Sequence, residues 1–319
     1  MSERVLIIGG AGSIGANLAN KLHKDGKDIL VVDNLSSGNT GNLNDRIRFS
    51  YCDIFDKDKI SDIVKDFDPN YIFNLAAHFA NQNSVDYPYE DVKTNILGQI
   101  NVLEACKQLK SLVKYVYASS SCVYGHAEIM EESSSIYPYE TPYAINKFSA
   151  ELYTKYYAQQ FAIPTVSVRI FNTFGEGEIA GKYRNVIPNF IDKALTNEDI
   201  VITGNGKETR DFTYVLDTIQ CLTLSATSHF KHGEVFNSGT GIETEIKSLA
   251  EMIVSICESK SKIKFVERRS WDCVSSRVSS LDKSNDMLGY KPKYSVFNGL
   301  ENTITWYKAR INEKSNSTN

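Results

Sequence analysis

The sequence predicts an α/β fold, in which a doubly wound parallel sheet is accompanied by a smaller, mostly helical α/β lobe. Three observations predict it. Short β-branched runs alternate with helical patterns through the first half of the chain. A glycine-rich turn, GGAGSIG, joins the first of these runs to the first helix, and the alternation breaks after Gly175. Strand–helix alternation of this kind places helices on both faces of a parallel sheet.

Each predicted element follows from its local pattern. Apolar, β-branched runs predict strands at RVLII (4–8), DILVV (28–32), RIRFSY (46–51), YIFNL (71–75), VKYVYA (113–118) and PTVSVRIF (164–171). Helical patterns between them predict helices near 13–24, 56–66, 90–110 and 142–161. Later helices are expected near 185–195, 215–228, 246–258 and 296–310, separated by short strands. We expect one lobe from residues 1–173, with about 212–238 returning to it, a second from 174–211 and 239–310, and a disordered tail over 311–319.

Composition narrows the class of protein. The 319 residues carry a formal net charge of −4 with Lys and Arg spread along the chain, which predicts no nucleic-acid partner. No apolar run is long enough to span a membrane, and the first strand begins too early for a signal peptide, so we expect a cytoplasmic protein with no membrane partner. The six cysteines are scattered without a CxxC pair or a His/Cys cluster, which predicts neither a disulfide framework nor a metal site.

The turn GGAGSIG is typical of a Rossmann-type dinucleotide site. Gly10, Gly12 and Gly15 fit GxGxxG, and Gly9 takes the first position in the related spacing GxxGxxG. Glycines permit the tight turn and bring the backbone close to a pyrophosphate, which then faces the N-terminus of the next helix. Asp33 ends the second strand, where a carboxylate binds the ribose hydroxyls and repels a 2′-phosphate, so NAD is favoured over NADP. The alternative is a glycine turn and a capping Asp in another kind of α/β protein.

The segment ETPYAINKFSAEL supplies Tyr143 and Lys147, one helical turn apart and therefore on one face. Thr141 suits the N-cap and Pro142 the first helical position. A tyrosine with an ordinary pKa of about 10 is a poor base at neutral pH. We expect the Lys147 ammonium and a positive nicotinamide to lower the pKa of Tyr143, so that it takes a proton from a sugar hydroxyl as hydride leaves. The alternative is a surface pair on an amphipathic helix, but this pair follows the hydroxyl-rich turn SSSCVYG.

Ten blocks together resemble the extended short-chain dehydrogenase/reductase family, particularly its nucleotide-sugar epimerases and dehydratases such as the UDP-glucose 4-epimerase-like enzymes. In order they are GGAGSIG, VVDNLSSG, CDI, NLAAH, TNILGQINVLEAC, YASSSCVYG, YAINK, RIFNTFG, NVIP and TRDFTYVLD. The resemblance implies a Rossmann-type sheet lobe that binds NAD and a second lobe that binds substrate. The implied cofactor-binding residues are Gly9, Gly12, Ser13, Ile14, Gly15, Asp33, Asn34, Asp53, Ile54, Ala76, Ala77, Asn95, Tyr143 and Lys147. Ser120 would be the catalytic hydroxyl beside Tyr143.

The resemblance also implies a nucleotide-diphosphate-sugar substrate and a homodimer paired through the helix of Tyr143 and the helix near 90–110. The implied substrate-binding residues are Ser119, Ser121, His78, Asn172, Asn185, Arg210 and Arg277. We choose Arg277 rather than Arg269 as the second substrate-binding arginine, because the alignment with the family pattern shifts in that region. A solvated salt bridge is the alternative for an arginine of this kind, and a structural imidazole is the alternative for His78.

Cys122 decides between the chemistries of this family. Relatives that dehydrate the sugar resemble Thr-Asp-Glu at Ser120, Ser121 and Cys122, and relatives that decarboxylate it carry Glu at Cys122. This chain has neither acid, so we expect epimerisation, most simply at C4 of a UDP-hexose through a transient 4-keto sugar, in sugar-nucleotide or surface-polysaccharide biosynthesis. A 3,5-epimerase that uses Cys122 as acid/base is the alternative, although the lysine of that pattern falls at Asn185. A 4,6-dehydratase, a 4-keto-reductase and a non-catalytic NAD-binding scaffold are further alternatives.

Overall fold

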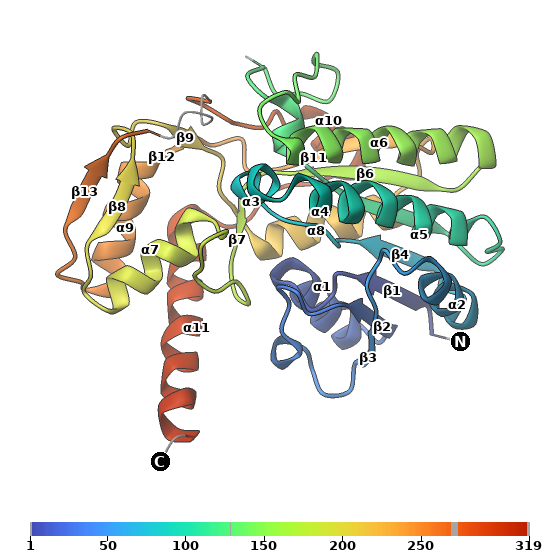
Figure 1. Cartoon of the computed structure of the whole chain (residues 1–319), viewed down its shortest axis with the longest axis horizontal. Helices are drawn as coiled ribbons and strands as arrows, with labels where there is room; N and C mark the ends of the chain where they lie inside the picture. The colour runs from blue at the N-terminus through green and yellow to red at the C-terminus, as the bar shows by residue number, and fades with distance from the viewer. Residues whose placement is uncertain (1, 128, 269–273, 318–319) are drawn as a thin grey trace.

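The computed structural model describes residues 2–127, 129–268 and 274–317. Its centre is a seven-stranded sheet in the order β11-β6-β5-β4-β1-β2-β3 (Figure 1). The strands are β1 (Arg4–Ile8), β2 (Asp28–Asp33), β3 (Arg48–Tyr51), β4 (Tyr71–Asn74), β5 (Lys114–Ser120), β6 (Thr165–Ile170) and β11 (Glu234–Ser238). Every neighbouring pair is parallel. This confirms the predicted doubly wound sheet, and the strand order reverses between β1 and β4, where such sheets bind ligands.

Helices cover both faces of the sheet because its strands are apolar on both sides. They are α1 (Ser13–Lys24) and α8 (Val215–Thr227) on one face, and α2 (Lys57–Phe67), α5 (Gln99–Cys106) and α6 (Pro142–Phe161) on the other. In β1, Val5 and Ile7 belong to the core beneath α1 and α8, whereas Leu6 and Ile8 belong to the core beneath α2, α5 and α6. The alternation follows from the period of two residues in a strand.

The helix expected near 90–110 is built from several pieces. They are α4 (Pro88–Val92), a π-helical turn called η2 (Lys93–Gly98), and α5, and a further short helix, α3 (Asn81–Asp86), precedes them. Pro88 begins α4 in the first turn, where its missing N–H has no partner to lose. The sequence prediction missed α3, because its six residues are mostly polar and too few to show a helical period.

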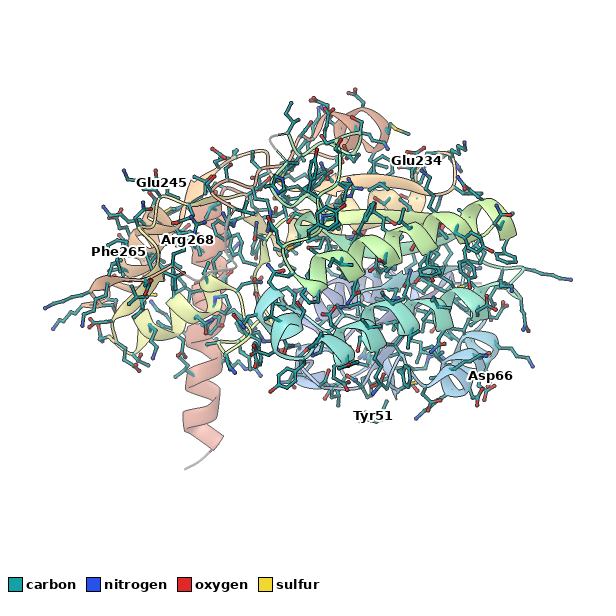
Figure 2. All side chains as sticks on the ribbon, turned by 45° about the horizontal axis from the view of Figure 1, so that its top comes forward. Tyr51, Asp66, Glu234, Glu245, Phe265 and Arg268 are labelled. Carbon is teal, nitrogen blue, oxygen red and sulfur yellow. The ribbon has the colours of Figure 1, made fainter. Side chains whose placement is uncertain are left out.

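The second lobe has two small sheets among helices. Its elements are α7 (Val186–Leu195), β8 (Ile200–Thr203), β9 (Thr209–Arg210), β12 (Thr244–Glu245), α9 (Ile246–Cys257), β13 (Ile263–Val266) and α11 (Val296–Ser317). β8 pairs with β13 in parallel, and β9 pairs with β12 antiparallel. Figure 2 shows Phe265 of this lobe toward one end of the molecule and Asp66 of the sheet lobe toward the other. A two-residue pair, β7 (Thr173–Phe174) with β10 (Thr213–Tyr214), lies where the chain passes between the lobes.

Two segments differ from the expected division. Helix α10 (Asp282–Leu288) packs against β11 and α8, because the buried Ser284 hydroxyl donates to the carbonyl of Asn237 at 2.6 Å. It therefore lies on the sheet rather than in the second lobe. The expected tail is helical as far as Ser317, since no Gly or Pro follows Gly299 to end α11. Residues 318–319 lie outside the described part of the chain. Within that part, no helix has the length and apolar character needed to cross a bilayer.

Candidate active site

One cavity of about 710 Å³ lies between the carboxyl ends of the sheet strands and the second lobe. The carboxyl ends of β1, β2, β4, β5 and β6 reach it from one side, and α7, β8 and β9 reach it from the other. Of the residues predicted from the sequence to bind or react, all but two line it. The two that are not among the lining residues are Asp53 and Asn95. Segments far apart in the sequence thus meet at the predicted edge of the sheet.

The glycine turn is packed so tightly that side chains do not fit. Gly9 has φ +75°, and a Cβ added there would lie 2.5 Å from the backbone nitrogen of Ala76. A Cβ on Gly15 would lie 2.4 Å from the carbonyl oxygen of Gly9. Gly12 is the N-cap of α1 and has no side chain that could accept hydrogen bonds from the N–H groups of the first helical turn. The first turn of α1 is therefore open to the cavity as a site for an anion.

Asp33 joins this turn to the end of β2. Its Oδ2 accepts a hydrogen bond from the Ala11 backbone N–H at 3.0 Å, and its Oδ1 accepts from Leu35 at 2.8 Å. Asn34 Nδ2 donates to Asp53 Oδ2 at 2.9 Å, so Asp53 stands behind Asn34 and outside the cavity wall. The predicted part of Asp53 in binding the cofactor stays a prediction, and in the structure Asp53 supports Asn34.

Asn95 likewise supports the wall from behind. It is 2% exposed, and its amide bonds both peptide groups of His78: Oδ1 accepts from the His78 N–H at 3.2 Å and Nδ2 donates to the His78 carbonyl at 3.3 Å. These two bonds hold the loop after β4 against the cavity.

The predicted catalytic side chains come together at the ends of β5 and α6. Thr141 caps α6 by accepting from the Ala144 N–H at 3.3 Å, and Pro142 occupies the first turn, as the sequence predicts. Tyr143 is 5% exposed, and the hydroxyl of Ser120 acts to lower its pKa. Lys147 Nζ donates to the carbonyl of Ala118 at 2.7 Å and lies 5.9 Å from the centre of the Tyr143 ring.

Burial governs the ionisation of this group. Removal from water raises the pKa of Tyr143 well above its usual value, and negative charge at Cys122 and Asp91 acts in the same direction. The Ser120 hydroxyl acts against this rise in the pKa of Tyr143. Burial lowers the pKa of Lys147 to about 8. The expectation that Lys147 lowers the pKa of Tyr143 is therefore wrong for the protein alone, because the burial of Tyr143 outweighs an ammonium that points at Ala118.

Cys122 faces an arginine from the far end of the chain. It lies on a 3₁₀ turn, η3 (Ser121–Tyr124), whose N-cap Ser120 accepts from the Cys122 N–H at 3.2 Å. Arg277 Nη1 lies 3.5 Å from Cys122 Sγ, and Arg277 Nη2 donates to Glu140 Oε2 at 3.2 Å. Glu140 also lines the cavity, although nothing in its sequence context marked it. Arg269, the arginine set aside in favour of Arg277, lies outside the described residues.

The second lobe contributes side-chain amides and a guanidinium to the wall of the cavity. Arg210 is held by backbone carbonyls, with Nη1 on Thr209 at 2.7 Å and Nη2 on Val274 at 3.1 Å. Asn185 is the N-cap of α7, and its Nδ2 donates to Glu178 Oε1 at 3.1 Å. The sequence analysis missed Glu178, whose pKa burial raises to about 7. A lone glutamate in a loop carries no pattern that would have shown its burial.

Asn172 joins β6 to the second lobe. Its Nδ2 donates to the carbonyl of Asp211 at 3.2 Å, and its side chain lines the cavity. The remaining predicted serines, Ser119 and Ser121, are both 3% exposed. Ser119 Oγ donates to the buried carboxylate of Glu151 at 2.9 Å, which turns it into the wall rather than toward a ligand.

A tyrosine and a lysine one helical turn apart, set against a dinucleotide-type turn on this sheet, define the short-chain dehydrogenase/reductase class of enzyme. The model of the NAD-dependent epimerase/dehydratase family matches residues 5–239, and the chain belongs to that family. NAD is the cofactor of this family, and the open N-terminus of α1 with Asp33 beside it fits that cofactor.

Solved structures and relatives agree with this assignment. An epimerase of Methanothermobacter thermautotrophicus is 38% identical with a TM-score of 0.93, over 99% of this chain and 95% of that one. A UDP-glucose 4-epimerase of Thermotoga maritima, solved with UDP-glucose, is 30% identical with a TM-score of 0.92, over 97% of this chain and 99% of that one. A UDP-N-acetyl-α-D-glucosaminuronate decarboxylase of Bacillus cytotoxicus is 33% identical over 98% of this chain and all of its own length, 100%. The chain is therefore similar to both epimerases and a decarboxylase of nucleotide sugars.

Proposed function

We propose that the protein is a 4-epimerase of a UDP-hexose that works through a transient 4-keto sugar. One observation carries the proposal. Ser120, Tyr143 and Lys147 line the same cavity as the glycine turn, and position 122 is a thiol rather than a carboxylate. The site therefore has the groups for oxidation at one carbon and lacks the acid expected for dehydration or decarboxylation.

The chain's own groups carry the proton chemistry. Tyr143 accepts the proton of the sugar 4-hydroxyl, and Ser120 holds the same oxygen by a hydrogen bond. Lys147 places its ammonium beside the site and holds the nicotinamide ribose. Bound NAD supplies the acceptor for the hydride at C4 and later its return. When the 4-keto sugar presents its other face, the proton returns from Tyr143 to the sugar oxygen, so that no atom is gained or lost overall.

We assign the cofactor to the sheet lobe, residues 1–173 with about 212–238, and the nucleotide sugar to the lobe formed by 174–211 and by most of 239–310. Asn172, Asn185, Arg210 and Arg277 line the cavity on that side. A guanidinium and amide N–H groups suit a diphosphate. Uridine is favoured because the similar enzymes of T. maritima and B. cytotoxicus are both named for UDP-sugars.

A second candidate is 3,5-epimerisation with Cys122 as acid/base. The 3.5 Å approach of Arg277 Nη1 to Cys122 Sγ favours it, since a nearby guanidinium stabilises a thiolate. The lysine that such a mechanism needs falls at Asn185 in this chain. Lys182 also lines the cavity, but it is 74% exposed and donates to the Tyr183 hydroxyl at 2.8 Å. We therefore place this reaction second.

Incubation of UDP-glucose, UDP-galactose and UDP-N-acetylglucosamine with the purified protein in D₂O, followed by NMR and mass spectrometry, tests the proposal. Inversion at C4 with no mass gain is the expected result. Deuterium on carbon would move the assignment to proton abstraction at Cys122. Loss of CO₂ from the corresponding UDP-uronic acids, with no epimerisation of the hexoses, would show that the protein is a decarboxylase.

We also propose a homodimer, paired through α6 and the segment 88–106. A stripe of apolar residues runs along the outer face of α6, where Ile145, Leu152 and Tyr156 are 43%, 51% and 49% exposed. α5 and η2 contact α6, so the two helical segments form one outer surface (Figure 1). Repeated apolar exposure along one helix face favours an interface over solvent.

A further inference from the structure

A buried carboxylate and an imidazole meet beneath the catalytic helix. Asp91 on α4 is fully buried, and its Oδ2 lies 3.5 Å from Nδ1 of His78, which lines the cavity. Neither atom has a hydrogen-bond partner among the described residues. Buried polar atoms without a hydrogen-bond partner are rare in proteins. Because His78 Nδ1 and Asp91 Oδ2 face each other, their geometry indicates that a proton lies between them.

The neighbours of His78 decide where that proton lies. Asn83 Nδ2 donates to the carbonyl of Phe79 at 2.7 Å, which fixes the orientation of the Asn83 amide. The same Nδ2 lies 3.1 Å from His78 Nε2. Because an amide nitrogen is only a donor, Nε2 must accept, and the proton of the neutral ring is on Nδ1, facing Asp91.

Asp91 is tied to the catalytic helix by its other oxygen. Its Oδ1 accepts from Asn146 Nδ2 at 2.6 Å. Asn146 is 5% exposed and stands on α6 between Tyr143 and Lys147. One carboxylate thus connects the loop that faces the sugar to the helix that carries both reactive groups.

We propose that Asp91 and His78 form a buried acid–imidazole pair that positions the catalytic helix and keeps the ammonium of Lys147 charged. The inference rests on the proposed roles of Tyr143 and Lys147. Asp91 acts on the catalytic helix through its contacts with Asn146 and His78. Asp91 and His78 are therefore positioning residues.

Electrostatics support this geometry. The groups that act on Lys147 are Asp91 from α4 and Cys122 from η3, and both raise the pKa of Lys147 against the larger effect of burial. Asp91 also raises the pKa of Tyr143. Without the charge on Asp91, the pKa values of both Tyr143 and Lys147 fall, so both limbs of a bell-shaped rate profile move to lower pH.

The first test detects the Asp91–His78 pair by NMR and does not depend on enzymatic turnover. The imidazole ¹⁵N spectrum of the full chain contains five histidines, and His78→Gln identifies the signal of His78. We expect the Nδ1–H tautomer in the native protein. We expect that tautomer to be lost in Asp91→Asn, because an amide N–H then faces Nδ1. An Nε2–H tautomer in the native protein, or no change in Asp91→Asn, overturns the pair.

The second test reads the charge on Lys147. In Asp91→Asn, titration of the Lys147 ¹³Cε signal, assigned with Lys147→Met, should move to lower pH. Asp217→Asn is the control, since Asp217 is 1% exposed and accepts two backbone N–H groups outside the cavity. An unmoved Lys147 titration refutes the inference whether or not a UDP-hexose is turned over, whereas absence of turnover in the native protein refutes the proposed function alone.

Discussion

Lys147 Nζ donates a hydrogen bond to the carbonyl oxygen of Ala118 at 2.7 Å, so that α6 is held against the end of β5. Ala118 precedes the serines of the turn SSSCVYG by one residue. The bond therefore sets the distance between the ammonium and the hydroxyl of Ser120. It also holds a positive charge in a place where Lys147 is only 2% exposed.

Replacing the reactive hydroxyl should stop the reaction without emptying the site. In Tyr143→Phe we expect kcat to fall by roughly 10² to 10⁴, the usual contribution of a general base. Binding of UDP, measured by calorimetry, should stay unchanged because the ring still fills its place. Tyr156→Phe on the exposed face of α6 serves as the control. Full turnover in Tyr143→Phe would show that another group takes the proton.

The rise of the rate with pH should end as Lys147 loses its proton. Burial lowers the pKa of Lys147 to about 8 and raises the pKa of the base Tyr143 well above its ordinary value. Because turnover needs a charged Lys147 and an ionised Tyr143, kcat/KM of the free enzyme should rise up to about pH 8 and level off above it. A rate profile measured between pH 6 and 10 checks this. A rise that continues to the ordinary lysine pKa would contradict it.

The stability of the folded protein should rise with pH as Lys147 loses its proton. The lowered pKa means that the unfolded chain binds this proton more tightly than the folded one, so charged Lys147 costs the fold about 3 kcal/mol at neutral pH. That cost disappears as pH rises from 8 toward 10.5, the ordinary value. Urea unfolding of the native protein and Lys147→Met should therefore differ most at neutral pH and converge at high pH. A constant difference across this range would exclude the linkage.

Removing the thiol tests its part in the chemistry. If hydride returns to the carbon that it left, kcat of Cys122→Ala should stay within a few-fold of the native value, because Cys122 then only fills its turn. The C4 inversion assay gives the measurement, and Cys257→Ala, outside the cavity, controls for loss of a thiol. Loss of activity by more than about 100-fold would indicate acid/base work by Cys122.

The buried ion pair behind the serine turn should matter for stability. Glu151 accepts from Arg169 Nη2 at 2.6 Å and Nε at 3.1 Å, and both side chains are almost wholly buried. Glu151→Gln leaves the guanidinium uncompensated, so we expect a loss of about 3–5 kcal/mol in the free energy of unfolding. Urea unfolding measures it. The double variant Glu151→Gln, Arg169→Met should recover part of the loss, and purely additive effects would speak against a coupled pair.

A charge on the outer face of α6 should separate the proposed dimer. Leu152→Glu places a carboxylate in the apolar stripe, and we expect light scattering to report a monomer. Val113→Glu is the matched control, because both native side chains are 51% exposed and Val113 lies outside α6 and the segment 88–106. A native protein that is monomeric at micromolar concentration would refute the dimer outright.

The sequence by itself determined the fold and the cofactor end of the site. The period-two apolar runs, the turn GGAGSIG and the cap Thr141-Pro142 act over short distances along the chain, so they are readable without the tertiary structure. The thiol at position 122 could also be read directly from the sequence.

The tertiary structure alone decided the ionisation of the site and the partners of its side chains. Arg277 lies 155 positions along the chain from Cys122, and Asp91 reaches His78 and Asn146 from a third segment. Burial set the pKa of Tyr143 and Lys147 against the expectation drawn from their spacing. Desolvation and charge contacts depend on which distant segments exclude water from a group, and no local pattern in the sequence records that.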